Sequence, residues 1–291
     1  MPGGARQGAG TVTGDILYRL RGPAAGPGPG AHRSREIGGI GVFRDQVPFW
    51  RHPDARRIDL RATLRDPFEG TVVRRFEERR ALEVWALVDL SASMRFRGTG
   101  VTWDLVTELC IALARSATRI GDAFGLIGCG AGPDLMLPAS RRRGTADVVA
   151  DRLAAIRPRG TSADGLLTAA SSLAGRRKLV MVVSDFRLPE ALIGALFARL
   201  QGHDVVPVAI EDGALDEGLP AFGLIELEDL EGGGRRRVMM RPSLRTRWLA
   251  REAERRESFR RLALRHGRPP YRLADRFDGD DFSRHLLWTA A

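Results

Sequence analysis

Short apolar runs alternate along the chain with longer segments in which apolar residues return every three or four positions. Uninterrupted short runs are typical of strands buried on both faces, whereas the longer spacing is typical of helices that bury one face. The runs predict strands at Glu83–Val88, Ala123–Ile127, Leu179–Ser184 and Val205–Ile210. The longer spacing predicts helices at Val101–Ile120, Asp147–Ile156, Ser162–Leu173, Pro189–Leu200 and Ser243–His266.

This alternation of strands and helices predicts an α/β fold with a doubly wound, mostly parallel sheet flanked by helices. A late hairpin is expected from Phe222–Leu227 and Arg237–Met240, on either side of a glycine-rich turn. Within the first residues, Thr11–Arg21 is a candidate for one short strand. We divide the chain into four parts. Residues 1–36 are a flexible N-terminal segment, and residues 37–81 are a small β-rich elaboration packed against the main domain. The main domain spans residues 82–270, and residues 271–291 are a C-terminal extension packed on it.

The charge balance is basic, with 46 lysines and arginines against 36 acidic residues, a net charge of +10. Such an excess can indicate a surface that binds nucleic acid. All of these cations except Lys178 are arginines, however, and the chain is rich in alanine and glycine. We interpret the excess as the composition of a GC-rich genome, and expect no specific nucleic-acid partner.

Several site classes are disfavoured by the residues present. Cys110 and Cys129 lie in apolar surroundings, and the five histidines have no metal-ligand spacing, so neither a disulfide scaffold nor a zinc site is expected. Asp278, Asp280 and Asp281 lack the 12-residue pattern of a calcium loop, and we expect the start of a helix there. The N-terminus has no apolar signal-peptide core, and no run reaches the roughly 18 residues of a membrane helix. We therefore expect a cytoplasmic protein with reduced thiols.

Oxygen-bearing side chains cluster after two of the predicted strands. Asp89, Ser91 and Ser93 follow the first, Asp185 follows the third, and Thr161 opens the helix between them. Ligands of parallel sheets bind beyond the carboxyl ends of the strands, so these groups are expected to meet at one edge. Hydroxyl and carboxylate oxygens suit Mg²⁺ or Mn²⁺. We expect the two serines to ligate one ion and the two aspartates to accept hydrogen bonds from metal-bound water.

Two other interpretations of the first motif remain open. Ser91 and Ser93 could merely cap the helix that follows, with Asp185 simply ending a strand. Asp89 could also be the nucleophile of an aspartyl-phosphate enzyme, although Ser91 stands where that chemistry would want a second carboxylic acid.

The segments DLSAS at 89–93, RGT at 159–161 and SD at 184–185 resemble the metal-ion-dependent adhesion site of von Willebrand factor A domains. The resemblance covers about residues 82–270. It implies a Mg²⁺ bound by Ser91, Ser93 and Thr161, with Asp89 and Asp185 in support. The open position of such an ion would take a carboxylate from a partner protein.

A second resemblance extends upstream, through HRSREIGGIGVFRD at 32–45, RRIDLRATLRDP at 56–67 and VRRFEERR at 73–80. With DLSASM at 89–94, these segments resemble the bacterial family called domain of unknown function 58, whose members resemble adaptors of MoxR-type AAA+ ATPases. Leu60 stands where that family usually has tryptophan, and N-terminal membrane helices common in the family are absent. In both respects the chain is more similar to the MxaS-like accessory proteins encoded with methanol dehydrogenase.

Together these observations lead us to expect a non-enzymatic, Mg²⁺-dependent protein-binding adaptor. It would work with a MoxR-type AAA+ ATPase in the assembly or metal-cofactor maturation of a client, for which the MxaS-like resemblance suggests methanol dehydrogenase. Two alternatives remain, a metal-dependent phosphoryl-transfer or hydrolytic enzyme and an arginine-rich nucleic-acid binder. The enzyme would need a general base, and no histidine is close in sequence to the three motif segments. The chain has no G-x-x-x-x-G-K-[ST] motif for binding ATP itself.

Overall fold

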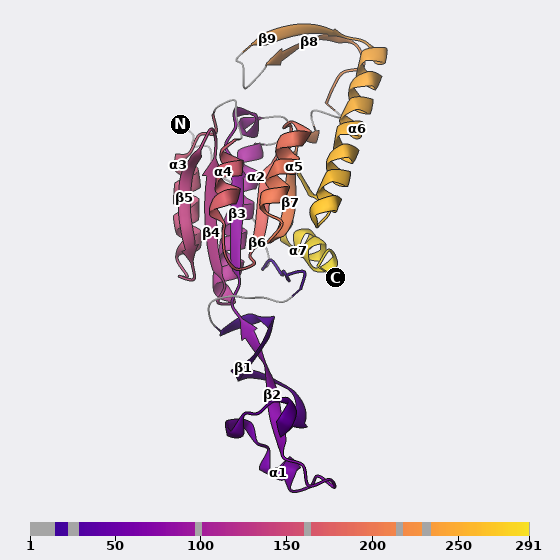
Figure 1. The fold of residues 1–291 in the computed structure, drawn as a ribbon. Helices are drawn as coiled ribbons and strands as arrows, with labels where there is room; N and C mark the ends of the chain where they lie inside the picture. Colours follow the sequence, from indigo (N-terminus) through magenta and orange to yellow (C-terminus); the bar gives the residue numbers. More distant parts are fainter. Residues whose placement is uncertain are drawn as a thin grey trace, which may run out of the picture.

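A six-stranded sheet forms the centre of the computed structural model, which describes residues 15–22, 29–96, 101–159, 164–213, 218–228 and 234–290 (Figure 1). The strand order is β10-β7-β6-β3-β4-β5. All neighbouring pairs are parallel except β4 and β5. The strands are β3 (Glu83–Asp89), β4 (Ala123–Cys129), β5 (Pro133–Ser140), β6 (Leu179–Ser184), β7 (Asp204–Glu211) and β10 (Tyr271–Ala274).

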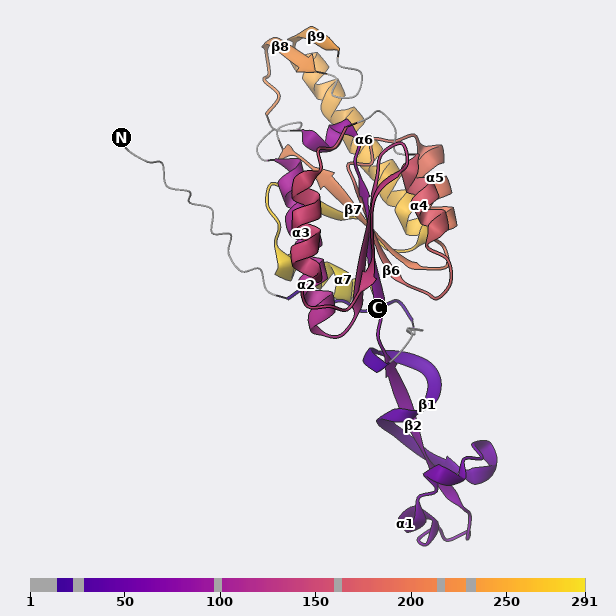
Figure 2. The ribbon, with the colours of Figure 1, turned by 90° about the vertical axis from the view of Figure 1, so that its left-hand side faces the viewer.

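Helices cover both faces of this sheet (Figure 2). Along β3, Val84, Ala86 and Val88 point to one face while Trp85 and Leu87 point to the other, because successive side chains of a strand alternate. The first face packs against α2 (Thr102–Arg119), α3 (Thr145–Ala155) and α7 (Gly279–Trp288), and the second against α4 (Gly165–Ser172), α5 (Glu190–Arg199) and α6 (Pro242–His266). This arrangement confirms the expected doubly wound α/β fold.

Two strands of the sheet were not expected from the pattern. β5 is an antiparallel edge strand whose side chains are half-buried or exposed, so it lacks the apolar run that marks a central strand. β10 is only four residues long, and it pairs with β7 at the other edge. The described residues 271–290 therefore pack on the main domain, as expected, and also complete its sheet and one helical layer. The Asp278 side chain accepts hydrogen bonds from two backbone amides at the start of α7, as expected for that position.

Within the described part of the N-terminal segment, residues 15–22, no strand forms, and alternate side chains are buried. Ile16, Tyr18 and Leu20 are buried among residues that include those of α2 and α7. The Ile16 amide donates to Ser116 Oγ of α2 over 2.9 Å, and the next amide donates to Ser283 Oγ of α7 over 2.9 Å. A segment expected to be flexible is thus held here, because its alternating apolar residues fill the gap between two helices.

Residues 29–80 form an arm that projects from the sheet (Figures 1 and 2). Its ribbon pairs β1 (Pro29–Pro48) antiparallel with β2 (Val72–Arg80). Between them lie two short 3-10 turns, η1 (Phe49–Arg51) and η2 (Ala55–Arg57), and the helix α1 (Leu60–Thr63). Two expectations differ from this: the boundary at residue 36 falls inside β1, and the elaboration is not packed against the main domain. The physical reason is that the described side chains of 43–76 bury only two apolar residues, Val47 and Val73, both within the arm.

The arm is joined to the main sheet at a buried carboxylate, Asp122, just before β4. Its Oδ2 accepts the Tyr18 hydroxyl and lies 2.7 Å from His32 Nε2 of β1, while its Oδ1 accepts the Leu82 amide over 2.8 Å. The rings of Tyr18 and His32 are stacked. Since β2 leads directly into β3, this joint lies at the amino ends of the parallel strands.

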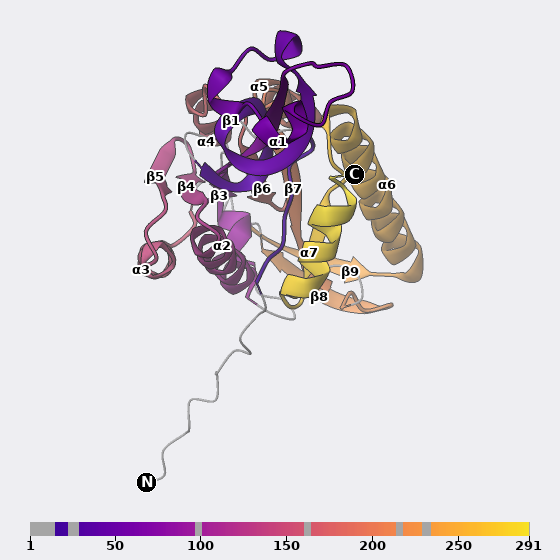
Figure 3. The same ribbon diagram turned by 90° about the horizontal axis from the view of Figure 1, so that it is seen from below.

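A second hairpin, β8 (Gly223–Glu228) with β9 (Arg235–Met240), precedes α6 as predicted. It lies at the opposite end of the molecule from the arm (Figure 1). Seen from below in Figure 3, the arm lies in front of the amino ends of the strands. Among the described helices, none combines the length and apolar character needed to cross a membrane.

Candidate metal centre

The end of β3 turns sharply and gathers three of the predicted site residues. Asp89 is the last residue of the strand and fully buried, and Ser91 and Ser93 enter the 3-10 turn η3 (Ala92–Arg95). One Asp89 oxygen, Oδ1, accepts the Ser91 amide over 2.8 Å, which fixes the turn. The two serine hydroxyls lie 3.0 Å apart. The turn therefore directs both hydroxyls to one place, with the carboxylate behind them.

This spacing fits a divalent cation. Two neighbouring ligands about 2.1 Å from an octahedral Mg²⁺ lie roughly 3 Å apart, which matches the distance between the two hydroxyl oxygens. The capping alternative fits less well, because the Ser91 side chain precedes η3 but accepts no capping hydrogen bond from a backbone amide of that turn. The residues present thus suit Mg²⁺ or Mn²⁺ in both donor type and spacing.

The neighbouring strand β6 ends at Ser184 and adds a contact that the sequence did not reveal. Its hydroxyl donates to Asp89 Oδ2 over 2.7 Å and accepts the Phe186 amide. Asp185 is half-buried beside it, and its Oδ1 accepts the Arg187 amide over 3.0 Å. Phe186 has a φ of 49°, rare for an aromatic residue, and its buried ring stacks on Phe259 of α6. This bend at the strand end carries Asp185 toward the edge where Ser93 lies.

Burial dominates the electrostatics of Asp89. Burial raises the pKa of its carboxyl group above the ordinary value, and the negative charge of Asp185 acts in the same direction. The hydrogen bonds from Ser184 and Ser91 oppose this rise by stabilising the charged form. Two carboxylates that repel each other in this way are an arrangement that a divalent ion would stabilise.

The fifth predicted residue, Thr161, lies outside the described residues. The described residues on either side approach the same edge. The Arg159 amide donates to the Leu90 carbonyl over 2.8 Å, and the Gly165 amide at the start of α4 donates to the Gly130 carbonyl over 3.0 Å. A side chain on Gly165 would meet the Gly130 and Gly132 carbonyl oxygens, so glycine is required for this close approach. The glycine-rich turn after β4 therefore serves to seat α4 beside the site.

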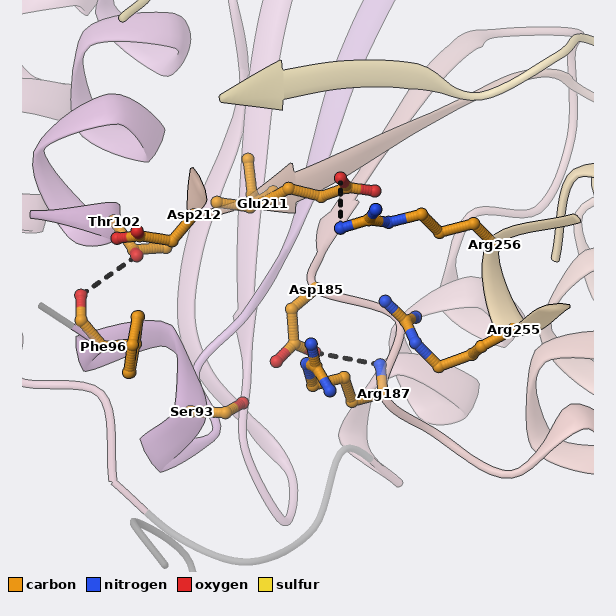
Figure 4. A pocket seen from close by; sticks show the side chains of 10 residues that line it. Ser93, Phe96, Thr102, Asp185, Arg187, Glu211, Asp212, Arg255 and Arg256 are labelled. Carbon is orange, nitrogen blue, oxygen red and sulfur yellow. Dashed lines mark hydrogen bonds and ion pairs between the residues drawn. The ribbon is translucent and has the colours of Figure 1, made fainter. Parts of the chain in front are cut away.

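A pocket opens beside Ser93 and Asp185 (Figure 4). Two of its lining residues, Arg187 and Arg255, are held by Glu252 of α6, which accepts both arms of the Arg187 guanidinium over 3.0 and 3.1 Å and is also bonded by Arg255. Burial acts to raise the pKa of Glu252, but the two guanidiniums outweigh it, so this pKa lies below its ordinary value. The lining residues are Ser93, Phe96, Thr102, Asp185, Arg187, Ile210, Glu211, Asp212, Arg255 and Arg256.

The sequence reasoning missed the contribution of α6 to this pocket. Its Glu252 and Arg255 are part of an alternation of opposite charges along the helix, and such an alternation is typical of a solvated helix face. Glu252 is instead buried, at 8% exposure. In the part of the chain that the structure describes, no histidine lines the pocket, and no three His, Cys, Asp or Glu side chains gather as a metal cluster of their own. Any cation here would depend on the serine hydroxyls.

The fold and this site define a doubly wound α/β protein with a candidate cation centre at the carboxyl ends of its strands. Residues 51–258 match the family described as "Protein of unknown function DUF58", and the chain belongs to that family.

Its relatives carry little description of their own. A protein of Paracoccus denitrificans, described as an uncharacterized protein in the moxR 3' region, is 37% identical over 108 residues, 36% of this chain and 99% of the relative. An uncharacterized protein of Mycobacterium tuberculosis is 28% identical over 245 residues, covering 81% of this chain and 70% of the relative.

Similar solved structures include the conserved hypothetical protein BatB from Bacteroides thetaiotaomicron, at a TM-score of 0.43 and 15% identity over 72% of this chain and 99% of that one. The SpRpn10 VWA domain matches 45% of this chain and 75% of its own, with a TM-score of 0.35 and 18% identity. The fold assignment here rests on the strand order and the two helical layers described above.

Proposed function

We propose that this chain is a Mg²⁺-dependent adaptor that binds a client protein at the carboxyl ends of its strands and works with a MoxR-type AAA+ ATPase. The observation that carries the proposal is the pair of hydroxyls, Ser91 Oγ and Ser93 Oγ, set 3.0 Å apart in front of the buried Asp89. Asp185 from the adjacent strand would accept hydrogen bonds from metal-bound water.

The chemistry of these ligands favours binding over catalysis. Neutral hydroxyl ligands leave most of the positive charge of a bound Mg²⁺ uncompensated, so an open coordination position would attract a carboxylate of a partner. Catalysis of hydrolysis or phosphoryl transfer would need a general base, and of the usual candidates the described pocket lining offers carboxylates but no histidine. The chain would then act by holding a client and not by transforming it.

The ATPase partner is inferred from the family and from one relative. The Paracoccus denitrificans protein is described by its position in the moxR 3' region, and it aligns over almost its whole length with this chain. Neighbouring genes often encode proteins that work together, so a MoxR-type ATPase is the partner to test first. The resemblance to MxaS-like proteins makes methanol dehydrogenase the first client to test.

The experiment compares three forms of the full chain: wild type, the Ser91→Ala/Ser93→Ala variant and a Ser171→Ala/Ser172→Ala control. The control also removes two adjacent hydroxyls, but from the last turn of α4. Calorimetry with Mg²⁺ should detect about one site per chain in the wild type and control, and none in the first variant. In a pull-down in Mg²⁺, the wild type and the control should capture the candidate client, and the Ser91→Ala/Ser93→Ala variant should not. Circular dichroism should show that all three chains are folded.

Two results would contradict the proposal. The wild type could fail to bind Mg²⁺ at millimolar concentration, both alone and with the ATPase present. Alternatively, the Ser91→Ala/Ser93→Ala variant could remain folded and capture the client as well as the wild type does, which would leave the motif without a role in binding.

A further inference from the structure

The far end of the arm exposes large apolar side chains. We call residues 49–70 the arm tip. Trp50, Leu60, Leu64 and Phe68 are 74, 72, 86 and 89% exposed, and all four lie in this short segment, away from both hydrophobic cores (Figure 2). A single exposed leucine needs no explanation, but a projecting element that exposes four large apolar side chains is typical of a binding surface.

Contacts within the arm tip fix the outward direction of these side chains. Asp59 is buried, and its oxygens accept the Gln46 side-chain amide and Arg74 Nε, each over 2.7 Å, and the Ala62 amide at the start of α1. The inner position next to the ribbon is therefore taken by a carboxylate. Leu60 and Leu64, four residues apart on α1 and its last turn, are exposed instead.

Further contacts hold the tip in one shape. Ile58 bridges to Val73 of β2, and the Val72 amide donates to Thr63 Oγ1 over 3.0 Å. The Asp66 side chain accepts the Gly70 amide over 2.7 Å and closes the turn that follows. The apolar side chains are thus presented on an ordered scaffold, which reduces the entropy lost when a partner binds.

The charges around the apolar residues are mostly positive. Arg51, Arg56, Arg61 and Arg65 are exposed at the tip, and the Arg51 guanidinium lies 5.0 Å from the centre of the Trp50 ring. Glu69 is the exposed acidic residue of the tip, while Asp54, Asp59 and Asp66 are engaged within the arm. A complementary surface would have an apolar groove with carboxylates at its rim.

We propose that the arm tip docks into an apolar groove, rimmed by acidic residues, on a partner protein, and that this partner is the AAA+ ATPase of the proposed function, on which this inference rests. The arm leaves from the amino ends of the strands, whereas the candidate metal centre lies at their carboxyl ends. The seven residues of β3 separate the two ends by about 20 Å. One end of the molecule can therefore hold the ATPase while the other holds a client.

Two other occupants fit the tip less well. In a tip-to-tip contact with a second copy of this chain, the four exposed arginines of each tip would face one exposed acidic residue, Glu69. A lipid surface usually takes up the apolar face of a long amphipathic helix, and α1 is only four residues long.

The test uses the full chain and the purified MoxR-type ATPase encoded in the same genome, with affinities measured by biolayer interferometry in Mg²⁺ and ATP. Leu60→Ser/Leu64→Ser removes apolar contacts, and Arg61→Glu/Arg65→Glu reverses the charge of the rim; all four side chains are exposed, so the fold should persist. The control Met136→Ser/Val148→Ser removes two exposed apolar side chains from the main domain. Each tip variant should bind the ATPase at least about tenfold more weakly, and the control should bind as the wild type does.

The outcomes separate this inference from the proposed function. If the wild type does not bind the ATPase at all, both the proposed function and this inference are wrong. If the wild type binds and both tip variants bind equally well, the inference alone is wrong. It is also wrong if the tip variants abolish a dimer seen by sedimentation, or binding to vesicles of phosphatidylglycerol, while leaving ATPase affinity unchanged. Retained Mg²⁺ binding by the tip variants would support two independent sites.

Discussion

Replacing Arg268 with methionine should destabilise the protein strongly. Arg268 follows α6, and its guanidinium is buried, with the residue only 1% exposed. Nε and Nη2 donate to the two oxygens of Asp204 at the start of β7, over 3.0 and 2.7 Å. Nη1 donates to the Leu286 carbonyl of α7 and Nη2 to the Arg19 carbonyl, each over 2.6 Å. One side chain thus ties the N-terminal segment, the sheet and the last helix together.

The size of the loss can be worked from these contacts. Methionine fills much of the space of the arginine stem but donates no hydrogen bond. Asp204 would keep only the Arg21 amide, at 2.6 Å, and would become a buried charge without a cation. Removing one partner of a buried ion pair costs about 3–5 kcal/mol, and the two carbonyls that lose their donor contribute to that range. We expect the free energy of unfolding to fall by about 4 kcal/mol.

Equilibrium urea unfolding at pH 7 measures this difference. The control is Arg284→Met, which removes an exposed arginine paired with Asp281 three residues earlier and should change the stability by no more than about 0.5 kcal/mol. Limited proteolysis should also cut Arg268→Met first near residues 15–22, because the segment loses its anchor. A loss below about 1 kcal/mol for Arg268→Met would refute the reasoning, since it would mean that the buried pair is readily replaced by water or by a local rearrangement.

Three further predictions concern the site, the arm and the thiols. Millimolar Mg²⁺ should raise the melting temperature of the wild type by binding only the folded state, and should leave that of Ser91→Ala/Ser93→Ala unchanged; an equal rise in both would exclude these hydroxyls as ligands. The bond from Arg74 holds the pKa of Asp59 at about 2, below its ordinary 3.8, so the stability it gives the arm tip is complete above pH 4 and lost as the pH falls toward 2. The protection factors of the α1 amides, which correct hydrogen exchange for the pH dependence of the intrinsic rate, should fall over that interval, and constant protection factors would contradict the prediction. Burial raises the pKa of both thiols, that of Cys110 to about 12, so Cys110 and Cys129 should resist iodoacetamide at pH 8 until urea is added; mass spectrometry of the native protein would reveal any alkylation.

Much of the central architecture follows from local patterns in the sequence. The apolar runs of β3, β4, β6 and β7 are buried on both faces, so each is recognisable without its neighbours. The start of α7 at Asp278 is likewise a local effect, since the carboxylate bonds to amides only two and three residues away. The turn at Asp89, Ser91 and Ser93 belongs to the same group, because its hydrogen bonds join residues two positions apart.

The sequence could not determine the contacts between residues that lie far apart in the chain. Ser184 bonds to Asp89 across 95 positions, and Arg187 to Glu252 across 65, although Glu252 lies in a helix whose charges indicated a solvated face. Whether a charged side chain is buried depends on which partner the fold brings to it. The pattern of neighbouring residues in the sequence does not identify that partner.

The exposed arm tip and the buried N-terminal segment have the same explanation. Leu60 and Leu64 have the spacing of a buried helix face, whereas Ile16 lies in the N-terminal segment, which we expected to be flexible apart from one candidate strand at Thr11–Arg21. The tertiary structure exposes the two leucines and buries the isoleucine, because Asp59 takes the inner position of the arm and Ile16 fills space between α2 and α7. Apolar residues are drawn to any surface that excludes water, and only the assembled fold decides where such a surface exists.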